Sequence, residues 1–194
     1  AKTIISLSIN YFTGNASKQN NIGKISNYAW GDDYHKLIKG KLIELLQLIQ
    51  KKYPNIKGLT CVDTAPVMEK YWAQKGGIGW IGKHTNLITR SHGSWVFLGE
   101  IIIDHNIKPD SEFNDDLCGS CTPCLDACPN NAFPEPYVLD ASKCISYLTI
   151  EHRGNFKKNT NLEGWIYGCD ICQEVCPWNI KFAQNTSEPS FQIR

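Results

Sequence analysis

The stretch Cys118-Gly119-Ser120-Cys121-Thr122-Pro123-Cys124-Leu125-Asp126-Ala127-Cys128-Pro129 carries four cysteines separated by two, two and three residues, and it ends in Cys-Pro. Bacterial ferredoxins bind 4Fe-4S clusters with this spacing, placing three thiolates on one cluster and the fourth on a second cluster. The spacing therefore predicts a ferredoxin-like fold with two clusters in this part of the chain.

A second cysteine run, Cys169-x2-Cys172-x3-Cys176-Pro177, is one cysteine short of the first. Cys144 is available to supply the missing thiolate from a distance, which gives eight thiolates for two complete clusters. By the crossing pattern of ferredoxins, the expected ligand sets are Cys118, Cys121, Cys124 and Cys176 for one cluster, and Cys128, Cys144, Cys169 and Cys172 for the other.

Zinc is the main alternative for these cysteines, because C-x2-C pairs also build tetrahedral thiolate sites. A zinc site usually takes two pairs separated by a loop, whereas successive x2 intervals with a Cys-Pro ending suit a cubane cluster better. Disulfides are disfavoured, because a chain without a secretory signal belongs in a reducing compartment. The ninth cysteine, Cys61, lies in a predicted strand and is expected to be a small buried hydrophobic residue.

The composition is that of a soluble globular protein. Of 194 residues, 42% are hydrophobic, and 20 Lys and Arg against 19 Asp and Glu give a net charge of +1, so any nucleic-acid site must be local. Apolar runs such as Ile101–Ile103 are far shorter than the roughly 18 residues of a membrane span. We therefore expect a cytoplasmic monomer without membrane contact. Because the one methionine, Met68, is internal, we also expect a fragment that lacks both ends.

The first 117 residues mix predicted strands and helices, which indicates an α/β or α+β layer fold. Apolar residues alternate with polar ones from Thr3 to Tyr11, as in a strand with one buried face. Between Tyr34 and Ile49 the apolar residues recur with a helical period, behind a capping Asp32 or Asp33. Further predicted elements are a strand near Lys57–Val62, a helix near Pro66–Lys75, and strands at Thr85–Thr89 and Ser94–Ile103.

A glycine-rich run, Gly77-Ile78-Gly79-Trp80-Ile81-Gly82, matches the dinucleotide-binding pattern G-x-G-x-x-G, and with Lys83 it matches the start of a P-loop. Both contexts are wrong, because the run follows a predicted helix and enters a strand, and His84 stands where a P-loop needs Ser or Thr. We interpret it as a loop whose backbone amides approach a bulky or anionic ligand, with a plain turn as the alternative.

Further motifs occur in one order over nearly the whole chain. They are Tyr28-Ala29-Trp30-Gly31, Asp33-Tyr34-His35, Asp63-Thr64-Ala65-Pro66-Val67-Met68-Glu69-Lys70, Gly79-Trp80-Ile81-Gly82-Lys83, Gly93-Ser94-Trp95-Val96-Phe97-Leu98-Gly99-Glu100-Ile101 and Gly168-Cys169-Asp170-Ile171-Cys172-Gln173-Glu174-Val175-Cys176-Pro177-Trp178-Asn179. Together they resemble the tRNA epoxyqueuosine reductase family.

The resemblance implies an α+β protein with two domains. These are a nitroreductase-like α/β corrinoid-binding and catalytic domain, here residues 1–110, and a ferredoxin-like domain with two 4Fe-4S clusters, here residues 111–194. It implies an oxidoreductase of tRNA processing that uses cobalamin to reduce epoxyqueuosine to queuosine at the wobble position of tRNA, the last step of queuosine biosynthesis. Electrons would come from an external donor through the two clusters.

Asp63 matches the proton donor proposed for that family. Expelling an epoxide oxygen as water takes two electrons and two protons, so an acid must lie near the departing oxygen. Burial against the corrin face would help such an acid to keep its proton. Taken without the resemblance, Asp63 is more simply a helix cap.

The cofactor and RNA contacts are also expectations. We expect no histidine ligand to cobalt, since the resemblance implies cobalamin bound without one, and we note that His84 stands where we expect an Asn in that family. The expected corrinoid contacts are Ser26, Tyr28, Asp63, Lys83, Thr85 and Ser146. The expected tRNA phosphate contacts, near the aromatic Trp165, are Arg90, His92, Arg153, Lys157 and Lys158, with a solvated charged face as the alternative.

Two other functions remain open. A dicluster ferredoxin-type electron-transfer module would need no corrinoid but would leave the first 117 residues unexplained. A reductive dehalogenase relative would share the corrinoid and both clusters, but such enzymes are typically exported and the chain shows no export signal. Cobalt content separates the first from the enzymes, and activity on tRNA or organohalides separates the enzymes from each other.

Overall fold

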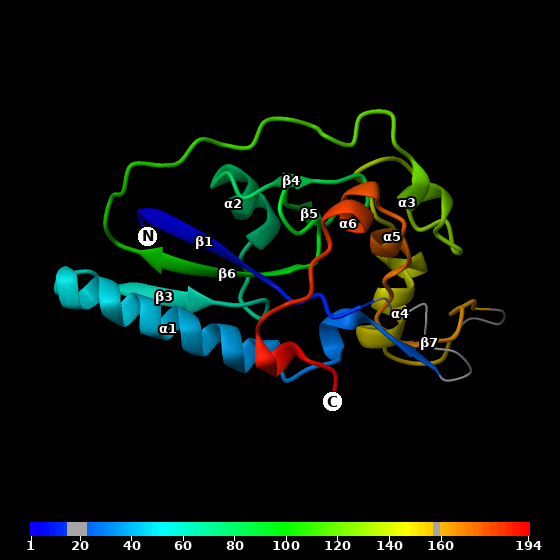
Figure 1. The fold of residues 1–194 in the computed structure, drawn as a ribbon, viewed down its shortest axis with the longest axis horizontal. Helices are drawn as coiled ribbons and strands as arrows, with labels where there is room; N and C mark the ends of the chain where they lie inside the picture. The colour runs from blue at the N-terminus through cyan, green and yellow to red at the C-terminus, as the bar shows by residue number, and fades with distance from the viewer. Residues whose placement is uncertain (15–22, 157–159) are drawn as a thin grey trace.

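The structure is a computed structural model that describes residues 1–14, 23–156 and 160–194. Strands and helices are mixed along the chain, as predicted, and Figure 1 shows the long elements at one end of an elongated molecule and the cysteine segments at the other. The strands are β1 (Thr3–Asn10), β2 (Lys24–Ile25), β3 (Gly58–Cys61), β4 (Trp80–Ile81), β5 (Leu87–Ile88), β6 (Val96–Ile103) and β7 (Trp165–Tyr167). The helices are α1 (Tyr34–Lys52), α2 (Glu69–Lys75), α3 (Pro123–Asp126), α4 (Ile145–Ile150), α5 (Ile171–Glu174) and α6 (Pro177–Phe182), with 3-10 turns η2 (Asn27–Ala29), η3 (Ala141–Lys143) and η4 (Pro189–Phe191).

An antiparallel sheet in the order β1-β6-β3 organises the first half of the chain. Because side chains alternate along a strand, Ile101 and Ile103 of β6 point to one face, where they form the main core with Ile38 and Leu42 of α1. The opposite face lies toward α2, which contacts β1 and β6. On that face the register aligns Ser6, Glu100 and Cys61 in one row across the three strands.

The C-terminal part of the chain packs back on the N-terminal part. Strand β2 pairs in parallel with β7, and Phe191 of η4 is buried in the main core. The Asp32 N–H donates a hydrogen bond to the Ser190 carbonyl at 2.7 Å. The two halves therefore meet through the β2–β7 pair and through η4. Residues 104–117 connect them along the chain, from the end of β6 to the cysteine segment (Figure 1).

The predicted elements of the first half are present with shifted ends. The strand predicted from Thr3 is β1, and the helix predicted from Tyr34 begins there and continues to Lys52. The predicted helix at Pro66–Lys75 begins only at Glu69, because the backbone from Asp63 onward first forms tight turns in which the Thr64 N–H bonds to the Val62 carbonyl. The strand predicted at Thr85–Thr89 is shortened to β5, since Thr85 has a φ of 64° that does not fit a strand.

The glycine run lies between α2 and β5 and includes β4, so it has neither nucleotide-binding context. Its close approach is to the chain itself. A Cβ on Gly79 would lie 2.0 Å from the Ile88 carbonyl oxygen, and one on Gly82 would lie 2.4 Å from the Ile88 side chain. We predicted that glycines of this loop make room for a ligand. Gly79 and Gly82 instead make room for Ile88 of β5.

No helix within the described ranges of the chain is both long enough and apolar enough to cross a membrane.

Candidate functional site

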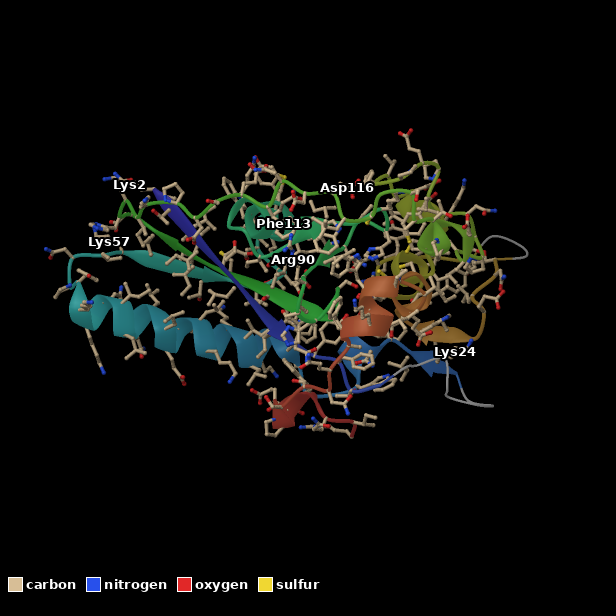
Figure 2. The ribbon with its side chains drawn as sticks, turned by 45° about the horizontal axis from the view of Figure 1, so that its top comes forward. Lys2, Lys24, Lys57, Arg90, Phe113 and Asp116 are labelled. Carbon is tan, nitrogen blue, oxygen red and sulfur yellow. The ribbon has the colours of Figure 1, made fainter. Side chains whose placement is uncertain are left out.

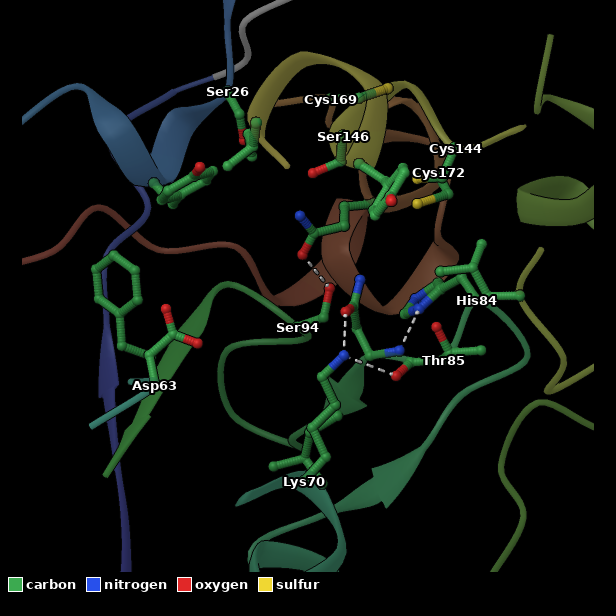
Figure 3. A pocket seen from close by; sticks show the side chains of 18 of the residues that line it. Ser26, Asp63, Lys70, His84, Thr85, Ser94, Cys144, Ser146, Cys169 and Cys172 are labelled. Atoms are coloured by element: carbon green, nitrogen blue, oxygen red, sulfur yellow. Dashed lines mark hydrogen bonds between the residues drawn. The ribbon is translucent and has the colours of Figure 1, made fainter. Parts of the chain in front are cut away.

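A cleft of about 750 Å³ opens where the end of the sheet meets the cysteine segments. Figure 3 shows Asp63 on one side of this cleft and Cys144 and Cys172 on the other. Residues far apart in the sequence thus share one cavity. The predicted site residues that line it are Ser26, Tyr28, Asp63, Thr85, Cys144, Ser146, Cys169 and Cys172.

Asp63 follows β3 in a turn that is unusual for a non-glycine residue, with a φ of 51°. Its side chain is 60% exposed, so the burial expected for a proton donor has to come from whatever fills the cleft. One carboxylate oxygen, Oδ2, accepts a hydrogen bond from the Tyr34 hydroxyl at 2.6 Å. Burial and this bond to Asp63 raise the pKa of Tyr34 well above its ordinary value, so the hydroxyl stays protonated and donates.

His35 lies between two carboxylates. Its Nε2 is 3.2 Å from Asp63 Oδ2, and its Nδ1 is 2.9 Å from Oδ1 of Asp33, the residue that caps α1. The hydrogen bond from His35 lowers the pKa of Asp33, which keeps that carboxylate charged. A histidine held in this way can pass a proton to Asp63 Oδ2, a role that the sequence analysis did not assign to it.

Ser26 lines the cleft, but it is buried and also contacts the second cysteine run. Its hydroxyl donates to Oδ1 of the fully buried Asp170 at 2.5 Å, and the Asn27 N–H donates to Oδ2 at 2.7 Å. Gly168 permits this approach, because its φ is +68° and a Cβ there would lie 2.4 Å from Ser26 Cβ. Asp170 therefore ties the β2–η2 segment to the cysteines on either side of it.

Replacing Asp170 with alanine should destabilise the protein by about 3 kcal/mol or more, because the change leaves the Ser26 hydroxyl and the Asn27 N–H buried without an acceptor. For a chain of this size that corresponds to a fall in Tm of roughly 6–12 °C. Asp115→Ala is the control, since Asp115 is an exposed partner of Arg90. Equal melting temperatures for the two variants would contradict the role of Asp170.

Among the described residues no three or more potential ligand side chains are arranged as a ready metal site, but the cysteines of each predicted set influence one another's pKa. Burial, and then the charges of Cys176, Cys118 and Cys121, together raise the pKa of Cys124 to about 11. In the other set, burial, and then the charges of Asp170, Cys144 and Cys128, together raise the pKa of Cys169 to about 12. Burial, and then the charges of Cys169, Cys144, Asp170 and Cys124, raise the pKa of the partly exposed Cys172 thiol well above its ordinary value. Thiols that influence one another in this way are neighbours in space.

The Cys128 sulfur accepts a hydrogen bond from the Ala132 N–H at 3.3 Å. Backbone bonds of this kind to thiolate sulfurs tune iron-sulfur clusters. Helices α3 and α5, which carry Cys124 and Cys172, are in contact with each other. The local framework thus suits two neighbouring clusters.

Lys83, a predicted corrinoid contact, is not among the cleft-lining residues. Its buried ammonium donates to the carbonyls of Gly119 and Cys121 at 2.5 and 2.9 Å, so it braces the first cysteine loop instead. The neighbouring His84 does line the cleft. Burial lowers the pKa of His84 to about 4, so it is neutral, and its Nδ1 accepts from the Asn86 N–H.

The described basic residues that were predicted to contact RNA each have contacts within the protein. Arg90 lies over the Phe113 ring, 5.2 Å from its centroid, and both residues are labelled in Figure 2. Arg90 also pairs with Asp115 at 3.2 Å. The His92 ring contacts the Ser91 hydroxyl, and Arg153 donates to the Ile150 carbonyl. Trp165 is only 1% exposed and packs with Ile145, so it cannot stack on a base as the expected neighbour of these residues. Lys157 and Lys158 lie outside the described residues.

Several site residues were not identified from the sequence. Tyr34 and His35 were recognised only as part of a motif, and Asp170 only as a residue between two cysteines. Lys70 also lines the cleft and donates to the Thr85 carbonyl at 3.1 Å. In the sequence, these residues are visible only as polar side chains near the ends of apolar elements. That pattern does not show which cavity a side chain reaches.

Two family models match the chain. One, described as "Epoxyqueuosine reductase QueG, DUF1730", matches residues 1–64, and one described as "4Fe-4S double cluster binding domain" matches residues 117–179. The second match favours 4Fe-4S clusters over zinc. Asp63 on one side of the cleft lies within the first match, and Cys144 and Cys172 on the other side lie within the second.

Curated proteins and solved structures agree with this assignment. An epoxyqueuosine reductase from Synechocystis sp. is 45% identical over 98% of this chain and 67% of its own length. A crystal structure of epoxyqueuosine reductase with a tRNA-Tyr epoxyqueuosine-modified stem loop is 34% identical, with a TM-score of 0.86 over 98% of this chain and 51% of that one. A Bacillus subtilis epoxyqueuosine reductase structure, with its catalytic aspartate loop swung out of the active site, is 31% identical with a TM-score of 0.85 over 98% and 51%.

The chain spans between 60% and 67% of the length of the curated relatives it matches, and about half of the length of the solved structures. Within that span the likeness extends from the sheet to the second cysteine run. The chain belongs to the epoxyqueuosine reductase family.

Proposed function

We propose that this chain carries the catalytic, cobalamin-binding and cluster-binding part of an enzyme that reduces epoxyqueuosine in tRNA to queuosine. The reaction takes up two electrons and two protons, and the epoxide oxygen leaves as water. The observation that carries the proposal is the shared cleft, in which Asp63 lies opposite Cys144 and Cys172. An acid and an electron-transfer centre at the same cavity are the two requirements of this reaction.

The proposal keeps the predicted domain division. Residues 1–110 would form the corrinoid-binding domain with a nitroreductase-like fold, and residues 111–194 the ferredoxin-like domain. The two family matches, at residues 1–64 and 117–179, fall within these ranges and support it.

The cleft suits a large cofactor with an apolar ring system and a polar rim. Its volume of about 750 Å³ lies in the upper part of the range for ligand pockets. Aromatic rings of Tyr28, Tyr34 and Tyr167 line it together with the polar Ser146, and the buried Nε2 of His84 has no hydrogen-bond partner among the described residues. These residues, with the backbone at Thr85, would hold cobalamin. We leave Lys83 out of this set because it braces the first cysteine loop.

The eight grouped cysteines would hold the two clusters in the sets predicted from their spacing. When bound, the clusters would relay single electrons from an external donor toward cobalamin, which would deliver them to the substrate. Cys144, Cys169 and Cys172 line the cleft itself, so the cluster of the second set would be the one nearest the cofactor.

The proton chemistry falls to residues of this chain. Asp63 would release a proton from Oδ2 toward the departing oxygen, and His35 would restore it through Nε2, which is 3.2 Å away. The Tyr34 hydroxyl donates to the same Oδ2 and helps to fix the orientation of the carboxylate. Asp33 holds the imidazole through Nδ1, so that Nε2 stays directed toward Asp63.

A tRNA partner is proposed from the likeness to the reductase solved with a tRNA-Tyr stem loop. The epoxide lies on an anticodon-loop base, so that base would have to enter the cleft. Arg153 and Arg90 remain candidates for phosphate contacts.

Anaerobic reconstitution followed by metal analysis tests the proposal. We expect about eight iron and one cobalt per chain after addition of cobalamin, and conversion of epoxyqueuosine to queuosine in tRNA with a chemical reductant. Full iron without cobalamin uptake, in both this chain and a full-length relative, would support a plain electron-transfer module instead. Cobalt uptake with turnover of organohalides and not of tRNA would support the dehalogenase alternative.

A further inference from the structure

A single acidic residue interrupts the apolar strand β6. Glu100 is 0% exposed, and neither of its carboxyl oxygens has a hydrogen-bond donor among the described residues. It sits in the middle of the row formed by Ser6, Glu100 and Cys61 on the face of the sheet toward α2. An isolated ionised carboxylate is very costly in such a place, so Glu100 needs either a partner or a proton.

A second carboxyl group is available as the partner of Glu100. Glu69 is the first residue of α2, which packs on this face of the sheet, and after burial its charge is the largest influence that raises the pKa of Glu100. Two carboxyl groups can bond only if one of them carries a proton, because ionised carboxylates only accept. A hydrogen bond between Glu69 and Glu100 would therefore require the pair to share one proton.

Glu69 also holds the backbone of Asp63. Its Oε1 accepts a hydrogen bond from the Asp63 N–H at 2.5 Å. At that residue the backbone is left-handed, with a φ of 51°, a conformation that costs free energy unless the surroundings impose it. The bond from Glu69 is the kind of contact that imposes it, and it sets where the Asp63 carboxylate points.

We propose that Glu69, bonded to a protonated Glu100, is a positioning residue that holds the Asp63 turn in its catalytic conformation. This inference rests on the proposed function for the role of Asp63, but the contact itself does not. In the Bacillus subtilis relative, a structure has the catalytic aspartate loop swung out of the active site, so the loop of that protein has more than one position.

The surroundings of the pair favour its protonated form. Burial, and then the charge of Glu69, raise the pKa of Glu100 to about 8. Burial and Asp63 raise the pKa of Glu69 as well, while Lys70 and the bonds from Glu100 and from the Asp63 N–H oppose the rise. The titratable or charged groups that face the pair are Lys70 from α2, Asp63 and Cys61 from β3 and the turn after it, and Tyr34 from α1.

The sign of the pH effect follows from these shifts. A carboxyl with a raised pKa is protonated in the folded protein at pH values where the unfolded chain has lost the proton. The pair therefore holds the turn best at low and neutral pH, and its contribution is lost as the pH rises through about 8. Above that value the buried Glu100 and the half-buried Glu69 are both ionised and repel each other, and Glu69 is displaced from the Asp63 N–H.

Amide hydrogen exchange at Asp63 tests the contact without any assay of activity. We expect Glu69→Ala in the cluster-loaded protein to lower the protection factor of the Asp63 amide about 10- to 100-fold, because a hydrogen bond to a charged acceptor is lost. Glu69→Gln keeps an acceptor oxygen and should change protection less than about 3-fold. Glu44→Gln, an exposed change on α1, is the matched control. An unchanged Asp63 amide in Glu69→Ala would overturn the proposal.

The pH profile of the same amide tests the shared proton. In the unmodified protein the protection factor should fall about 10-fold between pH 7 and pH 9. In Glu100→Gln it should stay level, because the amide group donates to Glu69 and does not titrate. The same fall in Glu100→Gln, or a level profile in the unmodified protein, would show that Glu100 does not control the turn.

Activity then separates this inference from the proposed function. Glu69→Ala should lower kcat about 10-fold or more, while KM for tRNA and the iron and cobalamin contents stay unchanged, and Glu69→Gln should recover most of kcat. Loss of Asp63 amide protection without any change in kcat would mean that the turn is held as described but that Asp63 is not the acid. That result would reject the proposed role of Asp63 and the catalytic meaning of the positioning contact together.

Discussion

Replacing Asp63 with asparagine should lower the rate of epoxide reduction by about 100- to 10,000-fold, the usual contribution of a general acid. Asparagine preserves the size of the side chain and can still accept the hydrogen bond from the Tyr34 hydroxyl, but it has no proton to give. Because Asp63 is 60% exposed to the cleft, the fold should tolerate the change. The measurement is single-turnover conversion of epoxyqueuosine-containing tRNA, with iron and cobalamin contents determined on the same sample.

Asp115→Asn is the control for Asp63→Asn, since it changes another exposed aspartate that lies outside the cleft. Normal iron and cobalamin contents in an inactive Asp63→Asn protein support the assignment. An active Asp63→Asn variant would remove it, and His35 would then become the leading candidate for the proton donor.

Replacing Cys176 with alanine should reduce the iron content from about eight to about four atoms per chain, because one cluster loses a ligand and the other keeps all four. Cys176 comes from the second run of the sequence, but it packs in one apolar cluster with Cys118 of the first run, and its charge raises the pKa of Cys124. The measurement is iron and sulfide analysis of the reconstituted protein, and Cys61→Ala, outside both groups, should keep about eight.

Double variants test the crossing of the two runs. Cys118→Ala with Cys176→Ala should still retain about four iron atoms, since both changes affect the same cluster. Cys172→Ala with Cys176→Ala should retain almost none, since each change affects a different cluster. The opposite pattern would show that each run holds its own cluster and would contradict the proposed ligand sets.

The cysteine runs could be interpreted from the sequence because their geometry is local. Residues three apart in a tight turn, such as Cys118 and Cys121, whose backbones share a hydrogen bond, lie close together whatever the rest of the chain does. The strand from Thr3 and the helix from Tyr34 were also predictable, since their periodic apolar residues need only one buried face.

The cleft was decided by tertiary structure. Asp63 meets His35 across 28 positions, and Ser26 meets Asp170 across 144. Lys83 belongs to a family motif and was predicted to contact the corrinoid, but its ammonium donates to two carbonyl oxygens of the first cysteine loop. A buried ammonium is stabilised more by two such acceptors than by an open cavity.

The sequence by itself predicted the cluster ligands and the course of the main strands and helices, because these predictions depend on the spacing of neighbouring residues. Only the tertiary structure decided which polar side chains share a cavity and which share a proton. Glu100 shows the difference most clearly. Its charge inside an apolar strand is visible in the sequence, but its meaning depends on Glu69, which the packing of α2 on the sheet brings to it. Burial then makes a proton necessary at that place, and no local pattern encodes that requirement.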